Sequence, residues 1–284
     1  MIGDKRYLYS TNRPIRLGIM CDGMTLQEWQ ARVLQYLLAL DFVKLQLLII
    51  DANVGDRSML SKMKKFLARP KHAIFHLYQH FIHRPRTARQ VDMSDLFHQV
   101  PFIRCKVVPE GEFSQYFTEA DCKKIGEYSL DVILKFGFGI IRGKVLNVAR
   151  HGVWSFHHDD EEKYRGGPPC FWEIYYGDDA TGGILQRLTD RLDGGIVLKK
   201  GFVATHKYSY SKNMEQLYYE SAKWPAQVCR DVHVGNADYL NALPSKTKAP
   251  IYHAPDNLQM LAFATKMLRN FVSVAWQLLF YREQ

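Results

Sequence analysis

Residues 15–50 read IRLGIMCDGMTLQEWQARVLQYLLALDFVKLQLLII and decide the fold. The apolar run Ile15–Cys21 predicts a strand, and Asp22-Gly23 after it is a turn signal. A second run, Val43–Ile50, is almost continuously apolar, as expected of a strand that is covered on both faces of a sheet. Apolar residues recur at helical spacing between the two runs. A strand, a helix and a second strand in this order predict a parallel sheet.

The helix between these strands is predicted to begin at Thr25. Thr25 and Glu28 have the spacing of a capping box, in which each side chain accepts a hydrogen bond from the backbone of the other residue. Trp29, Val33 and Leu37 follow at helical spacing.

The same alternation of strands and helices resumes after residues 51–100, a stretch rich in Lys, Arg and His that is predicted to be a basic insertion or an elaborated crossover. Strands are predicted at Phe102–Val108, Asp131–Phe136, Val153–His157, Gly183–Leu188 and Gly195–Leu198. Helices are predicted near residues 57–68 and 71–83, and at Thr118–Leu130, Lys144–Arg150, Pro169–Tyr176, Lys212–Val232 and Asn257–Tyr281.

These elements predict the α/β class: a Rossmann-like, open, mostly parallel sheet with helices on both faces, followed by a short C-terminal helical extension. We expect a catalytic domain over residues 13–232 and a mainly helical extension over residues 233–284.

The composition indicates a globular protein, and its net charge favours a negatively charged partner. Apolar residues make up 47% of the 284 residues and charged residues 24%, which is typical of a globular protein. The formal net charge of +9 favours anionic partners, such as a polyglutamylated cofactor, a nucleotide-linked substrate or RNA.

The five cysteines form no CxxC pair and suggest neither a disulfide framework nor a cysteine zinc site. The N-terminal residues are polar, without the apolar centre of a signal peptide, and Phe271–Tyr281 is too short to span a bilayer. The sequence therefore predicts a cytoplasmic protein without a membrane partner, and it leaves the oligomeric state open.

Three segments carry candidate chemistry: Ser155–Asp160 at the end of a predicted strand, the loop Lys163–Pro169, and the turn Thr189–Gly195. A histidine at a strand end beside a glycine-rich loop is a candidate acid or base. A carboxylate on a later turn can orient that histidine or hold its charge. Each of these signals is weak when it stands alone.

In combination, the segment from Asp131 to Gly201 resembles the formyltransferase family, which includes methionyl-tRNA formyltransferase, glycinamide ribonucleotide formyltransferase and sugar N-formyltransferases. The matching motifs follow the family's order: Phe136-Gly137-Phe138-Gly139-Ile140-Ile141, a strand that ends at His157, Tyr164-Arg165-Gly166-Gly167-Pro168, Gly177-Asp178 with Thr181-Gly182, and Leu192-Asp193-Gly194-Gly195.

The resemblance implies an active site of Asn, His and Asp, in which His157 is the histidine and Asp193 the carboxylate. Ser155 stands where the family has the Asn, so a shorter hydroxyl replaces an amide that could stabilise an oxyanion. Removal of an oxyanion donor commonly costs about 100- to 1000-fold in rate. Ser155 acting through a water, a backbone N–H or His158 could compensate.

The resemblance also implies the ligands. The formyl donor would be 10-formyltetrahydrofolate, and no metal is expected. The pterin would bind residues 136–141 and lie near Asp190, in the turn before Asp193. The acceptor would approach from Asp22 and Gly23, and Arg165 and Gly166 are further substrate-binding candidates.

The implied activity is the one-carbon transfer of formyl from 10-formyltetrahydrofolate to an amine of a small-molecule or nucleotide-sugar acceptor. Methionyl-tRNA is a less favoured acceptor, because residues 233–284 do not resemble the barrel domain of the tRNA enzymes. Hydrolysis of 10-formyltetrahydrofolate is a second alternative. A non-catalytic folate- or nucleotide-binding module is a third, which the missing Asn favours and which His157 and Asp193 oppose.

Overall fold

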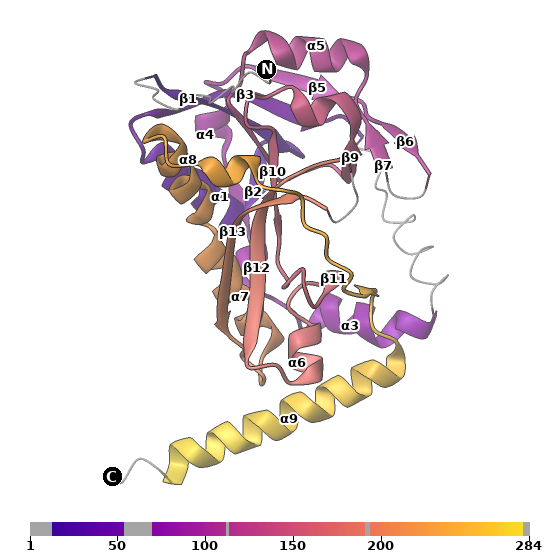
Figure 1. The fold of residues 1–284 in the computed structure, drawn as a ribbon. Coiled ribbons are helices and arrows are strands. Elements are labelled where there is room, and N and C mark those ends of the chain that lie inside the picture. The colour runs from indigo at the N-terminus through magenta and orange to yellow at the C-terminus, as the bar shows by residue number, and fades with distance from the viewer. Residues whose placement is uncertain (1–12, 54–69, 112–113, 191–193, 281–284) are drawn as a thin grey trace.

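The computed structural model describes residues 13–53, 70–111, 114–190 and 194–280 (Figure 1). A seven-stranded sheet of order β13-β12-β10-β8-β1-β3-β5 forms its centre. The strands are β1 (Ile15–Cys21), β3 (Val43–Asp51), β5 (Phe102–Cys105), β8 (Val132–Lys135), β10 (Val153–His157), β12 (Ala180–Arg187) and β13 (Ile196–Ala204). The strands from β5 to β10 pair in parallel, whereas β12 and β13 are antiparallel. The predicted mostly parallel α/β sheet is therefore confirmed.

Short strands form small sheets at the margins of the central one. They are β2 (Thr25–Gln27) with β4 (Gln90–Asp92); β6 (Val108–Glu110), β7 (Ser114–Tyr116) and β9 (Ile140–Arg142); and β11 (Arg165–Gly166) with β14 (Ile251–Tyr252). The strand predicted over Phe102–Val108 is thus divided, since β5 belongs to the central sheet and β6 to a marginal one.

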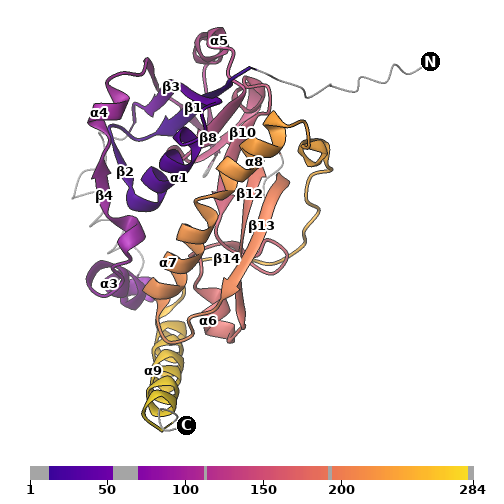
Figure 2. The ribbon, with the colours of Figure 1, turned by 90° about the vertical axis from the view of Figure 1, so that its left-hand side faces the viewer.

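Helices cover both faces of the central sheet, as predicted. One face carries α1 (Glu28–Leu38), α7 (Tyr210–Ser221) and α8 (Trp224–His233), which Figure 2 shows in front of the strands. The other face carries α5 (Glu119–Glu127) and η4 (Gly143–Asn147). The remaining helices are η2 (Pro70–His72), α3 (Ala73–Phe81), η3 (Arg86–Ala88), α4 (Ser94–Phe97), α6 (Trp172–Tyr176), η5 (Asp238–Asn241) and α9 (Asn257–Phe280).

The side chains of β8 alternate between the two faces. Val132 and Leu134 belong to the core beneath α1, α7 and α8, whereas Ile133 belongs to the core beneath α5 and η4. Because successive side chains of a strand point to opposite faces, Lys135 lies on the same face as Ile133.

The beginning of α1 differs from the prediction. Thr25 lies in β2, where antiparallel pairing with Asp92 holds it in an extended backbone, so α1 starts at Glu28. The side chain of Gln30 accepts a hydrogen bond from the backbone N–H of Gln27 at 2.9 Å. Gln27 and Gln30 thus take the capping roles that were predicted for Thr25 and Glu28, two residues earlier. The predicted helix 212–232 is likewise divided into α7 and α8, with Pro225 in the first turn of α8, where its missing N–H is tolerated.

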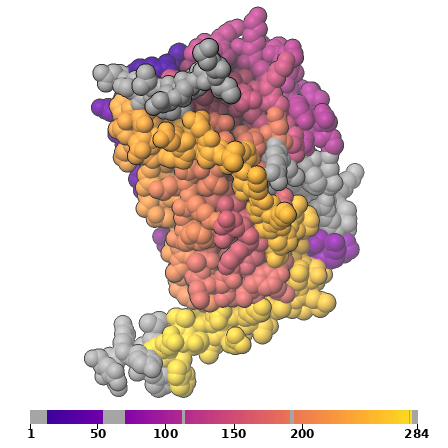
Figure 3. Space-filling view, viewed as in Figure 1, coloured from indigo at the N-terminus to yellow at the C-terminus, as the bar shows by residue number. Residues whose placement is uncertain are grey.

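The residues after 233 are attached to the body of the protein at several points. Thr247 donates a hydrogen bond to the carbonyl of Glu161 at 2.7 Å, and β14 pairs with β11. The helix α9 begins against Phe171, whose ring stacks on Phe263 at 4.2 Å, and then projects away from the body (Figure 3). The predicted C-terminal helix is confirmed, whereas the boundary at residue 232 stays a prediction.

Other sequence predictions concern residues 51–100 and the membrane. The helix predicted near 71–83 corresponds to η2 and α3, and the one near 57–68 lies outside the described residues. Within the described ranges, no helix combines the length and the apolarity that crossing a bilayer requires.

Gly166 is required where β11 pairs with β14. Its φ is +89°, and a Cβ atom there would lie 2.2 Å from the carbonyl oxygen of Tyr252. We expect Gly166→Ala to lower the free energy of unfolding by more than the roughly 1–3 kcal/mol typical of backbone strain, as measured by urea denaturation.

The matched control is Gly177→Ala, because Gly177 has a similar φ of +82° but no atom within 4 Å of its hypothetical Cβ. Equal losses of stability in the two variants would contradict the proposed clash with Tyr252.

Candidate active site

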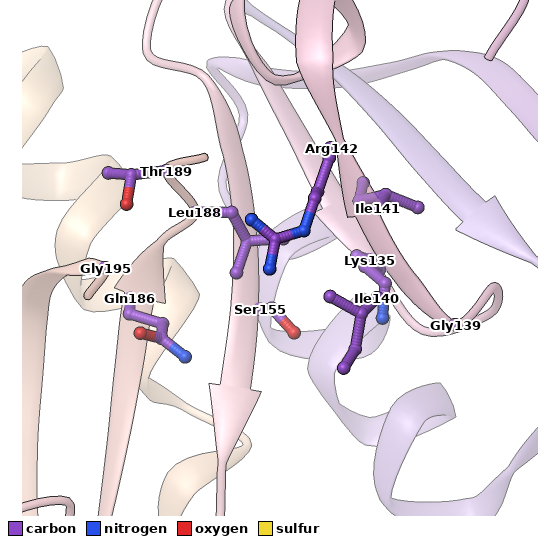
Figure 4. A pocket seen from close by; sticks show the side chains of 10 residues that line it. All are labelled: Lys135, Gly139, Ile140, Ile141, Arg142, Ser155, Gln186, Leu188, Thr189 and Gly195. Atoms are coloured by element: carbon purple, nitrogen blue, oxygen red, sulfur yellow. The ribbon is translucent and has the colours of Figure 1, made fainter. Parts of the chain in front are cut away.

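A cavity of about 150 Å³ lies at the carboxyl ends of β8 and β10 (Figure 4). Its lining residues come from β8, β9, β10, β12 and the turn after β12: Lys135, Gly139, Ile140, Ile141, Arg142, Ser155, Gln186, Leu188, Thr189 and Gly195. Ligands of open α/β sheets bind beyond the carboxyl ends of the strands, so the cavity has the expected place.

The predicted cofactor loop 136–141 divides into lining and packing residues. Gly139, Ile140 and Ile141 line the cavity. The ring of Phe136 packs against Trp29, with centroids 5.6 Å apart, and that of Phe138 packs against Phe117 at 5.0 Å. The two phenylalanine rings therefore hold the loop in place through the core.

Asp22 lies against this loop. A Cβ atom on Gly137 would lie 2.5 Å from Oδ1 of Asp22, and the backbone N–H of Gly137 donates to the carbonyl of Met20 at 3.0 Å. The predicted acceptor residue Asp22 thus borders the predicted cofactor loop through a contact that only glycine permits, whereas a Cβ atom on Gly23 would meet no atom within 4 Å.

Ser155 and His157 lie on one face of β10, because residues two apart on a strand point the same way. Ser155 lines the cavity, and His157 lies two residues closer to the end of the strand. Nε2 of His157 is 3.2 Å from the carbonyl oxygen of Tyr164. A carbonyl only accepts hydrogen bonds, so Nε2 carries the proton and Nδ1 of a neutral ring is the acceptor.

The second predicted catalytic group, Asp193, lies outside the described residues. Thr189 and Gly195, which precede and follow it in sequence, line the cavity. Asp190 does not line the cavity but holds its wall together: Oδ1 accepts from the backbone N–H of Gly143 at 2.7 Å, and its carbonyl accepts from the guanidinium of Arg142.

Asp159 is the carboxylate that the structure places near His157, with 4.0 Å between Oδ2 and Nε2. Asp159 is buried and accepts a hydrogen bond from the backbone N–H of Cys170 at 2.7 Å. Burial, and then the neighbouring Glu173, raise the pKa of Asp159 well above its usual value. The protonated form of Asp159 is therefore favoured, and it offers little negative charge to His157.

Arg165 and Gly166, predicted to bind substrate, contact the C-terminal part of the chain in this structure. The guanidinium of Arg165 donates to the carbonyl of Ala249 at 3.1 Å, and Gly166 pairs with Tyr252. Neither residue is among those that line the cavity.

His158 cannot replace the missing amide, contrary to the possibility raised from the sequence. It points away from Ser155, into the opposite core, where its ring stacks on Tyr218 with centroids 3.6 Å apart. Nε2 lies 3.1 Å from the hydroxyl of Ser221, and burial lowers the pKa of His158 to about 3. His158 is therefore a neutral packing residue.

Lys135 is a cavity residue that the sequence analysis did not identify. It ends the apolar strand β8, and its side chain lines the cavity together with Ser155 (Figure 4). Burial lowers the pKa of Lys135 to about 8, although the negative charge of Asp22 opposes the shift. A lysine directly after three buried apolar residues is the signal that could have indicated a buried cation.

The described residues also include an acidic cluster of Asp160, Glu161 and Glu162. The ammonium of Lys200 contacts all three carboxylates, at 2.8, 3.3 and 2.8 Å respectively. This cation already balances the cluster, which we interpret as an ion-pair network.

The buried carboxyl of Glu173 predicts how the stability of the protein changes with pH. Among the residues that the structure describes, neither of its oxygens has a hydrogen-bond partner, and burial raises its pKa from 4.5 to about 8. Between about pH 4.5 and about pH 8, Glu173 keeps its proton in the folded state but has lost it in the unfolded state. The free energy of unfolding therefore falls as the pH rises through this range. We expect Glu173→Gln to flatten this decline in the free energy of unfolding.

The exposed Glu127 at the end of α5 provides the control, Glu127→Gln. The free energy of unfolding is measured by urea denaturation at several pH values across this range. The same dependence on pH in Glu173→Gln and Glu127→Gln would contradict a buried, protonated Glu173.

For Lys135, the expected change of stability with pH has the opposite sign to that of Glu173. Its pKa of about 8, against an ordinary 10.5, means that the charged form costs the folded state at most about 3 kcal/mol below about pH 8. In the described part of the chain, Asp22 influences Lys135 electrostatically, and Arg142 lines the same cavity. We expect Lys135→Met to be more stable than the parent at neutral pH.

This advantage should shrink as the pH rises from about 8 to about 10.5, because the unfolded lysine then also loses its proton. Thermal unfolding at several pH values measures it. A parent protein as stable as Lys135→Met at neutral pH would show that Lys135 is well solvated.

Comparison with known proteins identifies relatives by sequence, although no family model matches the chain. The methionyl-tRNA formyltransferase of Agathobacter rectalis is 27% identical over 122 residues, which are 42% of this chain and 39% of that protein. That of Prochlorococcus marinus is 35% identical over 95 residues, 33% of this chain and 27% of the relative. That of Cutibacterium acnes is 24% identical over 192 residues, 66% of this chain and 59% of the relative. The chain thus spans less than two thirds of each of these relatives.

Among solved structures, the chain is similar to an N-formyltransferase from Helicobacter canadensis, with a TM-score of 0.49 and 12% identity over 84% of this chain and 70% of the other. It is also similar to a glycinamide ribonucleotide transformylase from Symbiobacterium toebii, with a TM-score of 0.47 and 13% identity over 84% and 93% of the two chains. Parts of the chain are thus similar in sequence to methionyl-tRNA formyltransferases.

Proposed function

We propose that the chain transfers a formyl group from 10-formyltetrahydrofolate to an amine of a small-molecule or nucleotide-sugar acceptor. The observation that carries the proposal is the position of Ser155 and His157 on one face of β10, where Ser155 lines a cavity that residues 139–141 wall on another side. The names of the curated relatives support the same reaction class.

The cavity has the character that a pterin requires. A pterin is a flat ring with hydrogen-bonding edges, and sites for such rings combine apolar walls with a few polar groups. Ile140, Ile141 and Leu188 supply the apolar walls, and Arg142 and Gln186 supply polar groups.

The orientation of His157 suits a general base. With Nε2–H donating to the carbonyl of Tyr164, Nδ1 can take a proton from the attacking amine and return it to the folate nitrogen that leaves. The amine nitrogen forms a bond to the formyl carbon, and the bond from that carbon to the folate nitrogen breaks. The products are a formamide and tetrahydrofolate. Asp193 would orient His157, as the family resemblance implies.

Methionyl-tRNA is the second candidate acceptor. The names of the curated relatives and the net charge of +9 favour it.

The test is a mass-spectrometric assay with 10-formyltetrahydrofolate and a panel that includes nucleotide-linked amino sugars, simple amines and methionyl-tRNA. A gain of 28 Da, the mass of one formyl group less one hydrogen, on a panel member identifies the acceptor. Formate release without an acceptor would indicate the hydrolase instead, and no turnover of any kind would contradict the proposal.

We expect His157→Ala to lower turnover by at least about tenfold, because a positioned acid or base commonly contributes more than that. Asp193→Ala should act in the same direction. The matched control is His98→Ala, which removes an exposed histidine next to β5, away from the cavity. Turnover by His157→Ala equal to that of the control would remove His157 from the reaction.

A further inference from the structure

We propose that Lys135 is a catalytic residue of this formyl transfer, and that its ammonium group donates a hydrogen bond to the oxyanion that forms on the formyl oxygen. The inference rests on the proposed function. It assigns to Lys135 the role that the family resemblance gives to an amide at the position of Ser155.

The pairing of the strands places Lys135 beside Ser155. In the parallel ladder of β8 and β10, Ile133 pairs with Val153 and Leu134 with Trp154. The next residue on each strand is Lys135 and Ser155, and both line the cavity. The two side chains therefore stand side by side on one face of the sheet, on the same face as His157.

Of the two polar side chains that flank Ser155, Lys135 is better placed than Gln186. Gln186 pairs with Ser155 from β12. Its amide oxygen lies only 2.2 Å from the position that a Cβ atom on Gly195 would occupy. The side chain of Gln186 is therefore held against the turn after β12. Figure 4 shows the Ser155 hydroxyl on the side of the cavity where the Lys135 amino group lies, with Gln186 on the other side.

The charges around Lys135 leave it available to an anion. Asp22 influences it electrostatically, yet no hydrogen bond or ion pair to its ammonium occurs within the described residues. Lys135 is partly buried, and an ammonium in such a place without a close partner gains from any negative charge that develops beside it. An oxyanion on the formyl oxygen supplies such a charge only in the transition state and the intermediate.

The transfer proceeds by addition of the amine to the formyl group and then by loss of the folate nitrogen. The amine nitrogen forms a bond to the formyl carbon, and the electron pair of the C=O double bond moves to oxygen, where Lys135 donates to it. His157 removes a proton from the nitrogen. When the oxyanion re-forms C=O, the bond to the folate nitrogen breaks and that nitrogen takes the proton from His157. Lys135 keeps its proton throughout.

The first test is Lys135→Met, with Lys144→Met as the control, since Lys144 is an exposed lysine paired with Glu119. We expect kcat to fall about 100- to 1000-fold, as for the loss of an oxyanion donor, while KM changes little. Lys144→Met should keep the parent kcat. Circular dichroism and thermal unfolding establish that both variants are folded.

Two further variants separate catalysis from packing. We expect the parent kcat to fall above about pH 8, where Lys135 loses its proton. Lys135→Arg keeps the charge, so it should retain more activity than Lys135→Met and should lack this fall. Adding Ser155→Asn to Lys135→Met restores an amide donor and should recover part of the lost kcat. A loss in Gln186→Leu alone, with Lys135→Met at parent kcat, would overturn the assignment.

A readout without turnover is competitive acetylation of lysines, measured by mass spectrometry, with and without 5-formyltetrahydrofolate, a stable analogue of the donor. We expect the analogue to protect Lys135 and not Lys144. If the parent turns over an amine but Lys135→Met matches it, only the role of Lys135 fails. If the parent formylates no amine, the proposed function fails, and the role of Lys135 in this transfer fails with it.

Discussion

The parallel ladder between β8 and β10 is the constraint on which the candidate site depends. Its register sets Ile133 beside Val153, and so brings Lys135 beside Ser155 at the carboxyl end of the sheet. A slip of one residue in either strand would turn its side chains to the opposite face, where the site would be lost into the core under α1 and α7. The buried apolar residues on both faces of β8 prevent this slip, so the packing of the core fixes the geometry of the polar groups.

Glycine at position 137 extends this constraint to β1. The hypothetical Cβ of Gly137 would lie 2.8 Å from the carbonyl carbon of Cys21 as well as 2.5 Å from Asp22, so any side chain would separate the ends of β1 and β8. Their close approach brings the carboxylate of Asp22 into the electrostatic environment of Lys135. The acceptor side and the folate side of the proposed reaction therefore meet at one backbone contact.

The sequence predicted the elements that depend on local apolar patterns and missed those that depend on pairing at long range. The bounds of Val153–His157 were predicted correctly, because the run is apolar and bounded by glycine and charge. The capping box at Thr25 was wrong, because pairing with Asp92, far along the chain, holds Thr25 extended. Lys135 was missed for the same reason, since its neighbour Ser155 is adjacent only through the ladder, and the convergence of His157 with Asp193 stays a prediction.

The ionisable groups of the site are arranged in a way that suits addition to a carbonyl. Burial disfavours charge on both kinds of group, so Asp159 near His157 favours its protonated form while Lys135 loses its proton more easily than a solvated lysine. At neutral pH a lysine with a pKa of about 8 still carries its charge in most molecules. Because burial disfavours its charged form, Asp159 adds little negative charge beside His157. The protein can therefore offer a cation to the developing oxyanion while it places little negative charge beside the histidine that faces the attacking amine, which is a combination that suits the addition step.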